Sequence, residues 1–235
     1  MVKTRLVLVG TEGEINLGMI ARLAENFDVD ELYLVNPQAD IEAAKEYAVH
    51  AFHRLDDARI VDTLEESLEN TSVSICTTAV KAESGDLLRV TTPLSQLPPL
   101  LEKISGRIAI VSGRESVGLT RDELSKCDLR ATIETSDRYR TMNLACSVAV
   151  TLYTIYNTLK RVDVSKPSIR TGNQKRRLAL NYASRIAENI FRDEQRRTNT
   201  ILLFKKILTP GFLEDPEASL LLTFLSRIHS RLKRG

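Results

Sequence analysis

Short apolar runs alternate with amphipathic segments along the first 160 residues of the chain. The runs predict β-strands at 5–9, 31–35, 60–61, 73–77, 108–111 and 131–133. The segments between them predict helices at 19–27, 41–51, 64–68, 97–104 and 144–159. Strands that alternate with helices in this way predict an α/β fold, in which right-handed crossovers place helices on both faces of a parallel sheet.

The pattern changes after residue 160. Residues 161–173 lack periodicity and contain Pro167 and Gly172, which predicts an interdomain linker. Segments 174–192, 200–208 and 217–233 then show helical spacing; in the first, we expect the apolar face to be Leu178, Tyr182, Ile186 and Ile190. The chain is therefore expected to hold an α/β domain at 1–160 and a small all-helical domain at 174–235.

Charge is distributed unevenly between these two parts. The net charge is +2, but residues 161–235 carry 16 Lys+Arg against 7 Asp+Glu, a balance of +9, so residues 1–160 carry 17 against 24, a balance of −7. Three basic clusters lie in the helical part: Lys175-Arg176-Arg177, Arg196-Arg197 and Lys205-Lys206. They predict a domain that attracts the phosphates of a polyanion, with an ordinary solvated helical surface as the alternative.

The cysteines and the apolar segments indicate the compartment. Cys76, Cys127 and Cys146 are widely spaced and form no C-x-x-C pattern, so we expect a reducing environment without disulfides or a cysteine zinc site. No signal-peptide pattern is present, and the uncharged segment 144–159 is too short and too polar to span a bilayer. We expect a cytoplasmic protein with no metal and no membrane partner.

Two loops carry the candidate chemistry. The strand at 108–111 stops at Ser112-Gly113, and the loop after it combines glycines with Arg114 and Glu115 before Thr120 and Glu123 predict a capping box. The strand at 131–133 is followed by the polar loop S-D-R-Y-R-T-M-N at 136–143. Open α/β sheets bind ligands at the carboxyl ends of their strands, so these loops predict a small-molecule site beside a second substrate.

Other interpretations exist for single residues. Gly10-x-x-Gly13 after the first strand lacks the G-x-G-x-x-G spacing of a dinucleotide site. Arg22 could simply form a surface pair with Glu25, and Glu115 could pair with a nearby arginine, either Arg114 or Arg121.

Three groups of residues taken together carry a family resemblance: Asn16-x-Gly18 with Arg22 and Asn26-Phe27, then Gly113-Arg114-Glu115 with Gly118-Leu119, then Met142-Asn143-Leu144 at the head of a helix. In this order they resemble the three motifs of the SPOUT class of RNA methyltransferases. The segments I-V-D-T-L-E-E-S-L, G-R-E-S-V-G-L-T-R-D-E-L-S-K-C and F-K-K-I-L-T-P-G-F-L resemble its TrmJ branch, tRNA ribose 2′-O-methyltransferases.

The resemblance implies a trefoil knot formed by the last strand–helix segment, from residue 129 to about residue 159, with S-adenosyl-L-methionine bound in it. On the matching positions the cofactor would contact Thr77, Thr78, Ala79, Gly113, Ile133, Arg140, Thr141 and Met142. The catalytic set would be Arg22 at the ribose hydroxyl, oriented with the ribose by Asn16, Glu115, Thr141 and Asn143. The helix 144–159 would form a homodimer interface.

The implied substrate is a pyrimidine nucleotide at position 32 of the tRNA anticodon loop, either cytidine or uridine. Tyr139 would stack on the target base or close the site, with packing on its own domain as the alternative. Two rival hypotheses remain at this point: a non-catalytic RNA-binding module, and a dinucleotide-binding oxidoreductase, which the turn chemistry at Gly10 disfavours.

Overall fold

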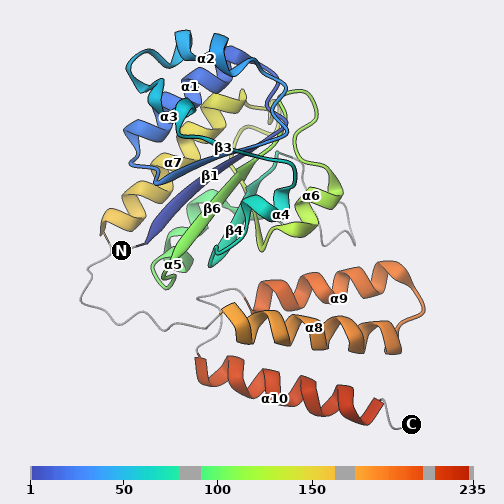
Figure 1. The fold of residues 1–235 in the computed structure, drawn as a ribbon. Helices are drawn as coiled ribbons and strands as arrows, with labels where there is room; N and C mark the ends of the chain where they lie inside the picture. Colours follow the sequence, from blue (N-terminus) through green and yellow to red (C-terminus); the bar gives the residue numbers. More distant parts are fainter. Residues whose placement is uncertain (1, 80–90, 162–172, 209–214, 233–235) are drawn as a thin grey trace.

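A seven-stranded parallel sheet is the centre of the fold (Figure 1). The structure, a computed structural model, describes residues 2–79, 91–161, 173–208 and 215–232. Every strand pairing is parallel, in the order β3-β2-β1-β6-β4-β7-β5. The strands are β1 (Lys3–Val9), β2 (Glu31–Val35), β3 (Arg59–Val61), β4 (Val73–Thr77), β5 (Thr92–Pro93), β6 (Arg107–Ser112) and β7 (Leu129–Thr132).

Helices cover both faces of this sheet, which confirms the predicted α/β class. Successive side chains of β1 point to opposite faces: Leu6 belongs to the apolar cluster under α1 and α7, whereas Val7 belongs to the cluster under α4 and α6. The helices are α1 (Glu14–Asn26), α2 (Ile41–Ala48), α3 (His53–Asp56), α4 (Leu64–Ser67), α5 (Pro98–Leu101), α6 (Arg121–Lys126) and α7 (Leu144–Arg161).

Several element bounds differ from the predicted ones. The predicted helix 41–51 ends at Ala48 because Val49 adopts a φ of 53°, which a β-branched residue rarely does; a 3-10 turn and α3 follow. The predicted helix 97–104 is shorter than expected: α5 covers only Pro98–Leu101, and a 3-10 turn at Leu94–Gln96 precedes it. The edge strand β5 was not predicted, because two residues are too few to show an alternating pattern.

Helix α1 begins five residues earlier than predicted and packs closely on α2. A Cβ at Gly18 would lie 2.4 Å from the Ala44 oxygen and 2.6 Å from the Tyr47 Cβ. Only glycine lets the two helices approach so closely at this point. The Asn16-x-Gly18 motif therefore has a packing role at Gly18 beside the chemical role expected of Asn16.

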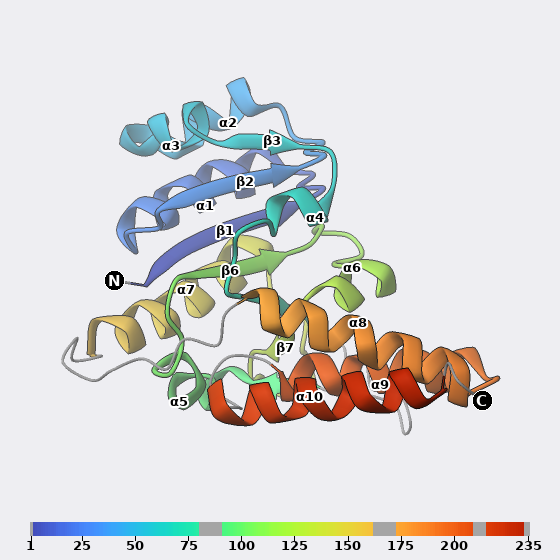
Figure 2. The same cartoon turned by 60° about the horizontal axis from the view of Figure 1, so that its bottom comes forward.

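Three further helices follow: α8 (Asn173–Ile190), α9 (Glu194–Ile207) and α10 (Asp215–Leu232), which lie side by side (Figure 2). The apolar face predicted for α8 is wrong at its ends, since Leu178 and Ile190 are exposed. The small residues Ala179 and Ala183 of α8 face the core instead, together with Ile186, and this allows close packing. Leu208 and Leu225 complete the buried cluster. The predicted linker 161–173 falls at 162–172 outside the described residues.

Candidate functional site

The residues predicted to contact the cofactor lie at the carboxyl ends of three adjacent strands. In the sheet, β4 pairs with β6 on one side and with β7 on the other. The Thr78 amide donates to the Ala131 carbonyl at 3.0 Å, and the hydroxyl oxygens of Thr77 and Ser112 are 3.1 Å apart. The structure thus brings residues 77–79, Gly113 after β6 and Ile133 after β7 to one edge, as parallel strand ends require.

Gly113 opens a loop that folds tightly back on itself. A Cβ at Gly113 would lie 2.3 Å from the Gly118 carbonyl carbon and 2.4 Å from the Leu119 nitrogen, so no other residue fits without moving backbone. The Gly118 amide donates to the Arg114 carbonyl at 3.0 Å, which closes the loop.

The loop is held against α6 by an ion pair. Arg114 donates two hydrogen bonds of 3.0 Å to the Glu123 carboxylate. Glu123 also completes the predicted capping box with Thr120. Burial alone would raise the pKa of Glu123, but the hydrogen bonds from Arg114 and from the Thr120 amide outweigh it, and the pKa is lowered.

Glu115 joins this loop to the loop after β1. Its Oε1 accepts from the Asn16 side-chain amide at 3.0 Å and from the Gly13 backbone amide at 3.2 Å, and its Oε2 accepts from the Glu12 amide at 2.9 Å. A carboxylate at the start of α1 is also favoured by the helix dipole. Arg114 pairs with Glu123, so the alternative in which it pairs with Glu115 is not formed.

Glu12 makes the reciprocal connection and was missed by the sequence analysis. Its carboxylate accepts from the Ser116 hydroxyl at 2.6 Å and from the Ser116 amide at 3.1 Å. A signal was present: each loop carries glycine, any residue, then glutamate, as Gly10-Thr11-Glu12 and Gly113-Arg114-Glu115. Each loop therefore places a carboxylate on backbone amides of the other loop, and the two loops fix each other in position.

Asn16 extends this network to the third motif. Its Oδ1 accepts from the Asn143 side-chain amide at 2.9 Å, and the Asn143 Oδ1 accepts from the Cys146 backbone amide at 3.2 Å. Asn143 thus caps the first turn of α7. Glu115, Asn16 and Asn143, which are far apart in sequence, form one hydrogen-bonded chain at the site.

The same contacts oppose a dinucleotide site. A pyrophosphate bound after β1 would need the free amides at the start of α1. The amides of Glu12 and Gly13 are occupied by the Glu115 carboxylate, and the Glu12 carboxylate adds a second negative charge. A phosphate at this position would therefore be repelled by two carboxylates and would find no free amide donors at Glu12 and Gly13.

Arg22 lies apart from this network. Among the described residues it has no hydrogen-bond or ion-pair partner, and Glu25, its alternative partner, contacts His53 and Arg54 instead. It opens onto a groove between α1 and the first turns of α7, lined by Met19, Arg22, Leu23, Asn26, Ala145, Cys146 and Ala149. Further along α7, Tyr153 is 61 % exposed.

The loop before α7 presents the remaining predicted residues. Arg140 pairs with Asp137, Thr141 is exposed and Met142 is half-buried. Tyr139 is 76 % exposed, so it does not pack on its own domain, and its ring is available to a second molecule.

The described residues hold neither a metal-binding cluster nor a membrane-spanning helix. No cluster of three or more His, Cys, Asp or Glu side chains could hold a metal ion there. None of the helices within that part of the chain is long and apolar enough to cross a membrane.

The chain is similar to known RNA methyltransferases in sequence and in fold. The model of the SpoU rRNA Methylase family matches residues 3–153. A tRNA (cytidine-2'-O-)-methyltransferase TrmJ from Sulfolobus acidocaldarius is 30 % identical over 98 % of this chain and 95 % of that protein. The chain belongs to the SpoU family and to its TrmJ branch. Family membership confirms the predicted enzyme class, a methyltransferase.

Solved structures show the same fold. TrmJ from Z. mobilis superposes with a TM-score of 0.70 at 20 % identity, covering 97 % of this chain and 99 % of that one. The SpoU methyltransferase AviRb from Streptomyces viridochromogenes, solved with AdoMet, gives a TM-score of 0.52 at 15 % identity, covering 68 % of this chain and 58 % of that one.

Proposed function

We propose that this methylase transfers a methyl group from S-adenosylmethionine to the ribose 2′-hydroxyl of cytidine 32 in the tRNA anticodon loop. The observation that carries the proposal is the chain of hydrogen bonds from Glu115 through Asn16 to Asn143, which joins the three motifs beside the ends of β4, β6 and β7. The Sulfolobus relative is named for cytidine, so cytidine is favoured over uridine.

The strand ends suit the cofactor. Residues 77–79, Gly113, Ile133 and 140–142 would hold it, with backbone groups to pair with the adenine edges and the half-buried Ile133 and Met142 as apolar walls. The backbone cradle at Gly113, which excludes a Cβ, supports this fit. The insertion of β7 between β4 and β5 supports a trefoil knot around the site. The bound cofactor supplies a methyl group already activated on a sulfonium.

The chain must then align the ribose and stabilise its oxygen as the proton leaves. An arginine is a poor base, since its guanidinium stays protonated in proteins. We assign Arg22 to stabilising the developing alkoxide, while an RNA phosphate or water takes the proton. Asn16, Glu115, Thr141 and Asn143 orient the ribose and the loops around it.

Arg22 acts across a homodimer in this proposal. It has no partner in its own chain among the described residues, and it lies in a groove whose neighbouring surface on α7 exposes Tyr153 and Val150. A second copy packed on α1 and α7 would cover this apolar surface and receive the guanidinium in its own site.

The remaining parts of the proposal concern RNA. The exposed Tyr139 would stack on the target base, and residues 174–235, after a linker at 161–173, would act as a basic tRNA-binding domain. A reaction on tRNA agrees with the predicted cytoplasmic location.

The decisive experiment maps 2′-O-methyl groups. Unmodified tRNA transcripts with C32, U32 or A32 are incubated with protein and S-adenosylmethionine, and ribonuclease fragments are analysed by mass spectrometry. We expect methylation at C32 and none on the A32 transcript. Cofactor binding without methyl transfer to any tRNA would favour the non-catalytic RNA-binding module, and calorimetric binding of NAD would favour the oxidoreductase.

A mixed-dimer test locates Arg22. Arg22→Ala and Glu115→Ala should each lose activity. If Arg22 acts across the interface, a heterodimer of the two variants contains one site with both native residues and recovers up to half the native rate. No recovery in a purified heterodimer would place Arg22 in its own subunit's site.

A further inference from the structure

The basic clusters of the C-terminal helices α8–α10 are each divided between a residue that binds protein and a neighbour that faces solvent. Members of the first kind donate hydrogen bonds to protein oxygens: Arg176, Arg197 and Lys205. Members of the second kind are exposed: Arg177, Arg196 and Lys206. Neighbouring residues of the same charge therefore differ in their contacts: one binds protein oxygens and the other faces solvent.

Arg176 connects α8 to the amino-terminal edge of the sheet. It is 6 % exposed, pairs through Nη2 with the Asp128 carboxylate just before β7, and donates through Nη1 to the Ser72 carbonyl at 2.8 Å. The other oxygen of Asp128 accepts from the Ser74 amide at 2.8 Å and hydroxyl at 2.9 Å. Asp128 is thus fixed by β4 while it binds the guanidinium.

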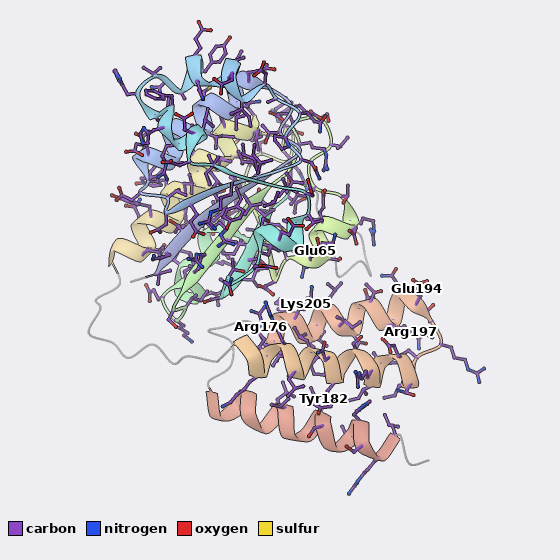
Figure 3. The ribbon with its side chains drawn as sticks, in the orientation of Figure 1. Glu65, Arg176, Tyr182, Glu194, Arg197 and Lys205 are labelled. Atoms are coloured by element: carbon purple, nitrogen blue, oxygen red, sulfur yellow. The ribbon has the colours of Figure 1, made fainter. Side chains whose placement is uncertain are left out.

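Lys205 makes a second connection beside the first (Figure 3). Its Nζ donates to the Ser125 carbonyl, in the last turn of α6, at 2.6 Å. Burial lowers the pKa of the Lys205 amine, and the charge of Asp128 acts in the opposite direction. Arg197 lies toward the other end of the helices and instead closes the α8–α9 turn, donating to the Phe191 carbonyl at 2.6 Å.

These polar contacts join two separate apolar cores. In the described part of the chain, the apolar clusters of the sheet contain no residue of α8–α10, and the cluster of α8–α10 contains none of the sheet. A buried guanidinium is tolerated only while it is paired, so removal of either partner leaves an uncompensated charge. Within the described residues, Arg176 and Lys205 thus supply paired polar contacts between the two cores.

We propose that Arg176, Asp128 and Lys205 form a docking site that fixes α8–α10 on the amino-terminal edge of the sheet, and that Arg177, Arg196 and Lys206 contact RNA phosphates. The second half rests on the proposed function. Docking holds the phosphate-binding cations at a set distance from the methyl-transfer site, which lies at the opposite ends of the same strands. A substrate that contacts both ends of the strands is therefore expected to be larger than an isolated anticodon stem-loop, which favours full-length tRNA.

Docking is tested without RNA by lysine acetylation of the full chain, followed by mass spectrometry. Lys205 should be protected and Lys206, the internal control, should react freely. Arg176→Ala should raise the reactivity of Lys205 about tenfold or more, whereas the matched control Arg177→Ala should leave it unchanged; circular dichroism checks that the helices persist. Equal reactivity of Lys205 and Lys206 in the native protein, or no change in folded Arg176→Ala, would overturn the docking site.

The RNA half is tested by the salt dependence of tRNA binding. The slope of log K against log salt falls by roughly 0.7–0.9 for each phosphate contact removed. The triple variant Arg177→Ala, Arg196→Ala and Lys206→Ala should therefore lose roughly 2–3 units of slope, while Arg176→Ala keeps the native slope. An unchanged slope in the triple variant, or an equal loss per residue in Arg176→Ala, would refute the division.

Turnover gives the last comparison. Arg176→Ala should methylate full-length tRNA about tenfold more slowly, while its rate on an anticodon stem-loop stays at the native value. Equal losses on both substrates would contradict a positioning role. If the native protein methylates no tRNA, the proposed function fails, and the acetylation result still decides the docking site.

Discussion

Replacement of Glu115 by glutamine tests whether the carboxylate positions the two loops. The three donors that face it are the Asn16 side chain and the amides of Glu12 and Gly13. A glutamine of the same size keeps one acceptor oxygen and turns the other into a donor. In the best rotamer it keeps Asn16 and Gly13 and points its amide at the Glu12 N–H.

The expected effect follows from the loss of one charge-assisted hydrogen bond at a half-buried carboxylate. Such a bond contributes roughly 1–2 kcal/mol after allowance for solvent. If that energy serves to hold the ribose-binding groups in place, kcat falls about 5- to 30-fold, since about 1.4 kcal/mol corresponds to a factor of ten. The affinity for S-adenosylmethionine should change by less than about threefold, because the residues that we assign to the cofactor are other ones.

The assay is single-turnover methylation of C32 tRNA with calorimetry of the cofactor in parallel. Glu42→Gln is the matched control, because this exposed carboxylate pairs with Lys45 on the α2 surface and the variant should keep native kcat. Native kcat in both Glu115→Gln and Glu115→Ala would show that the hydrogen bonds between the Glu115 carboxylate and the loop after β1 do not position the site.

Three further outcomes are expected. Arg22→Ala should lose at least a hundredfold in kcat with unchanged cofactor affinity, measured as above, because its guanidinium acts only as charge develops; full activity would refute the assignment. Tyr153→Asp should shift the protein toward monomers in analytical ultracentrifugation and lower activity, and an unchanged dimer would exclude this face. The pKa of Glu123 is lowered, so its ionised carboxylate stabilises the fold at pH values above the ordinary pKa of 4.5. This stabilisation is lost as the pH falls through the folded-state pKa. The difference in Tm between native protein and Glu123→Gln should therefore shrink between pH 6 and pH 3, and a constant difference would contradict the role of Arg114.

The strands of the sheet could be predicted because a buried strand is visible in the local sequence as an apolar run. Strands β2 and β4 have the predicted bounds, since a parallel strand buried on both faces is a continuous apolar run between polar ends. The positive φ at Val49 could not be predicted, because the surrounding residues continue a helical pattern and only tertiary packing favours the break. Likewise, β5 exists only through its pairing with β7.

The site was predictable in part for a different reason. Periodicity located the two loops, but it could not join Asn16 to Glu115 or to Asn143, because those hydrogen bonds connect positions about a hundred residues apart. The family resemblance named all three, and the repeated Gly-x-Glu could have added Glu12. Nothing in the sequence indicates that Arg22 faces a groove rather than its own loop network.

The basic clusters show that a count of charges does not tell which cations pair within the protein. Arg176 and Arg177 contribute equally to the +9 of residues 161–235, yet they point about 100° apart on α8. Arg176 precedes Ala179 and Ala183 by three and seven positions, so it lies in line with the buried face of the helix. A cation at such a position must find a partner, and Asp128, at the start of a buried strand, supplies it. Helical phase, and not local charge density, therefore separates the cations that pair within the protein from the exposed ones that we propose for RNA.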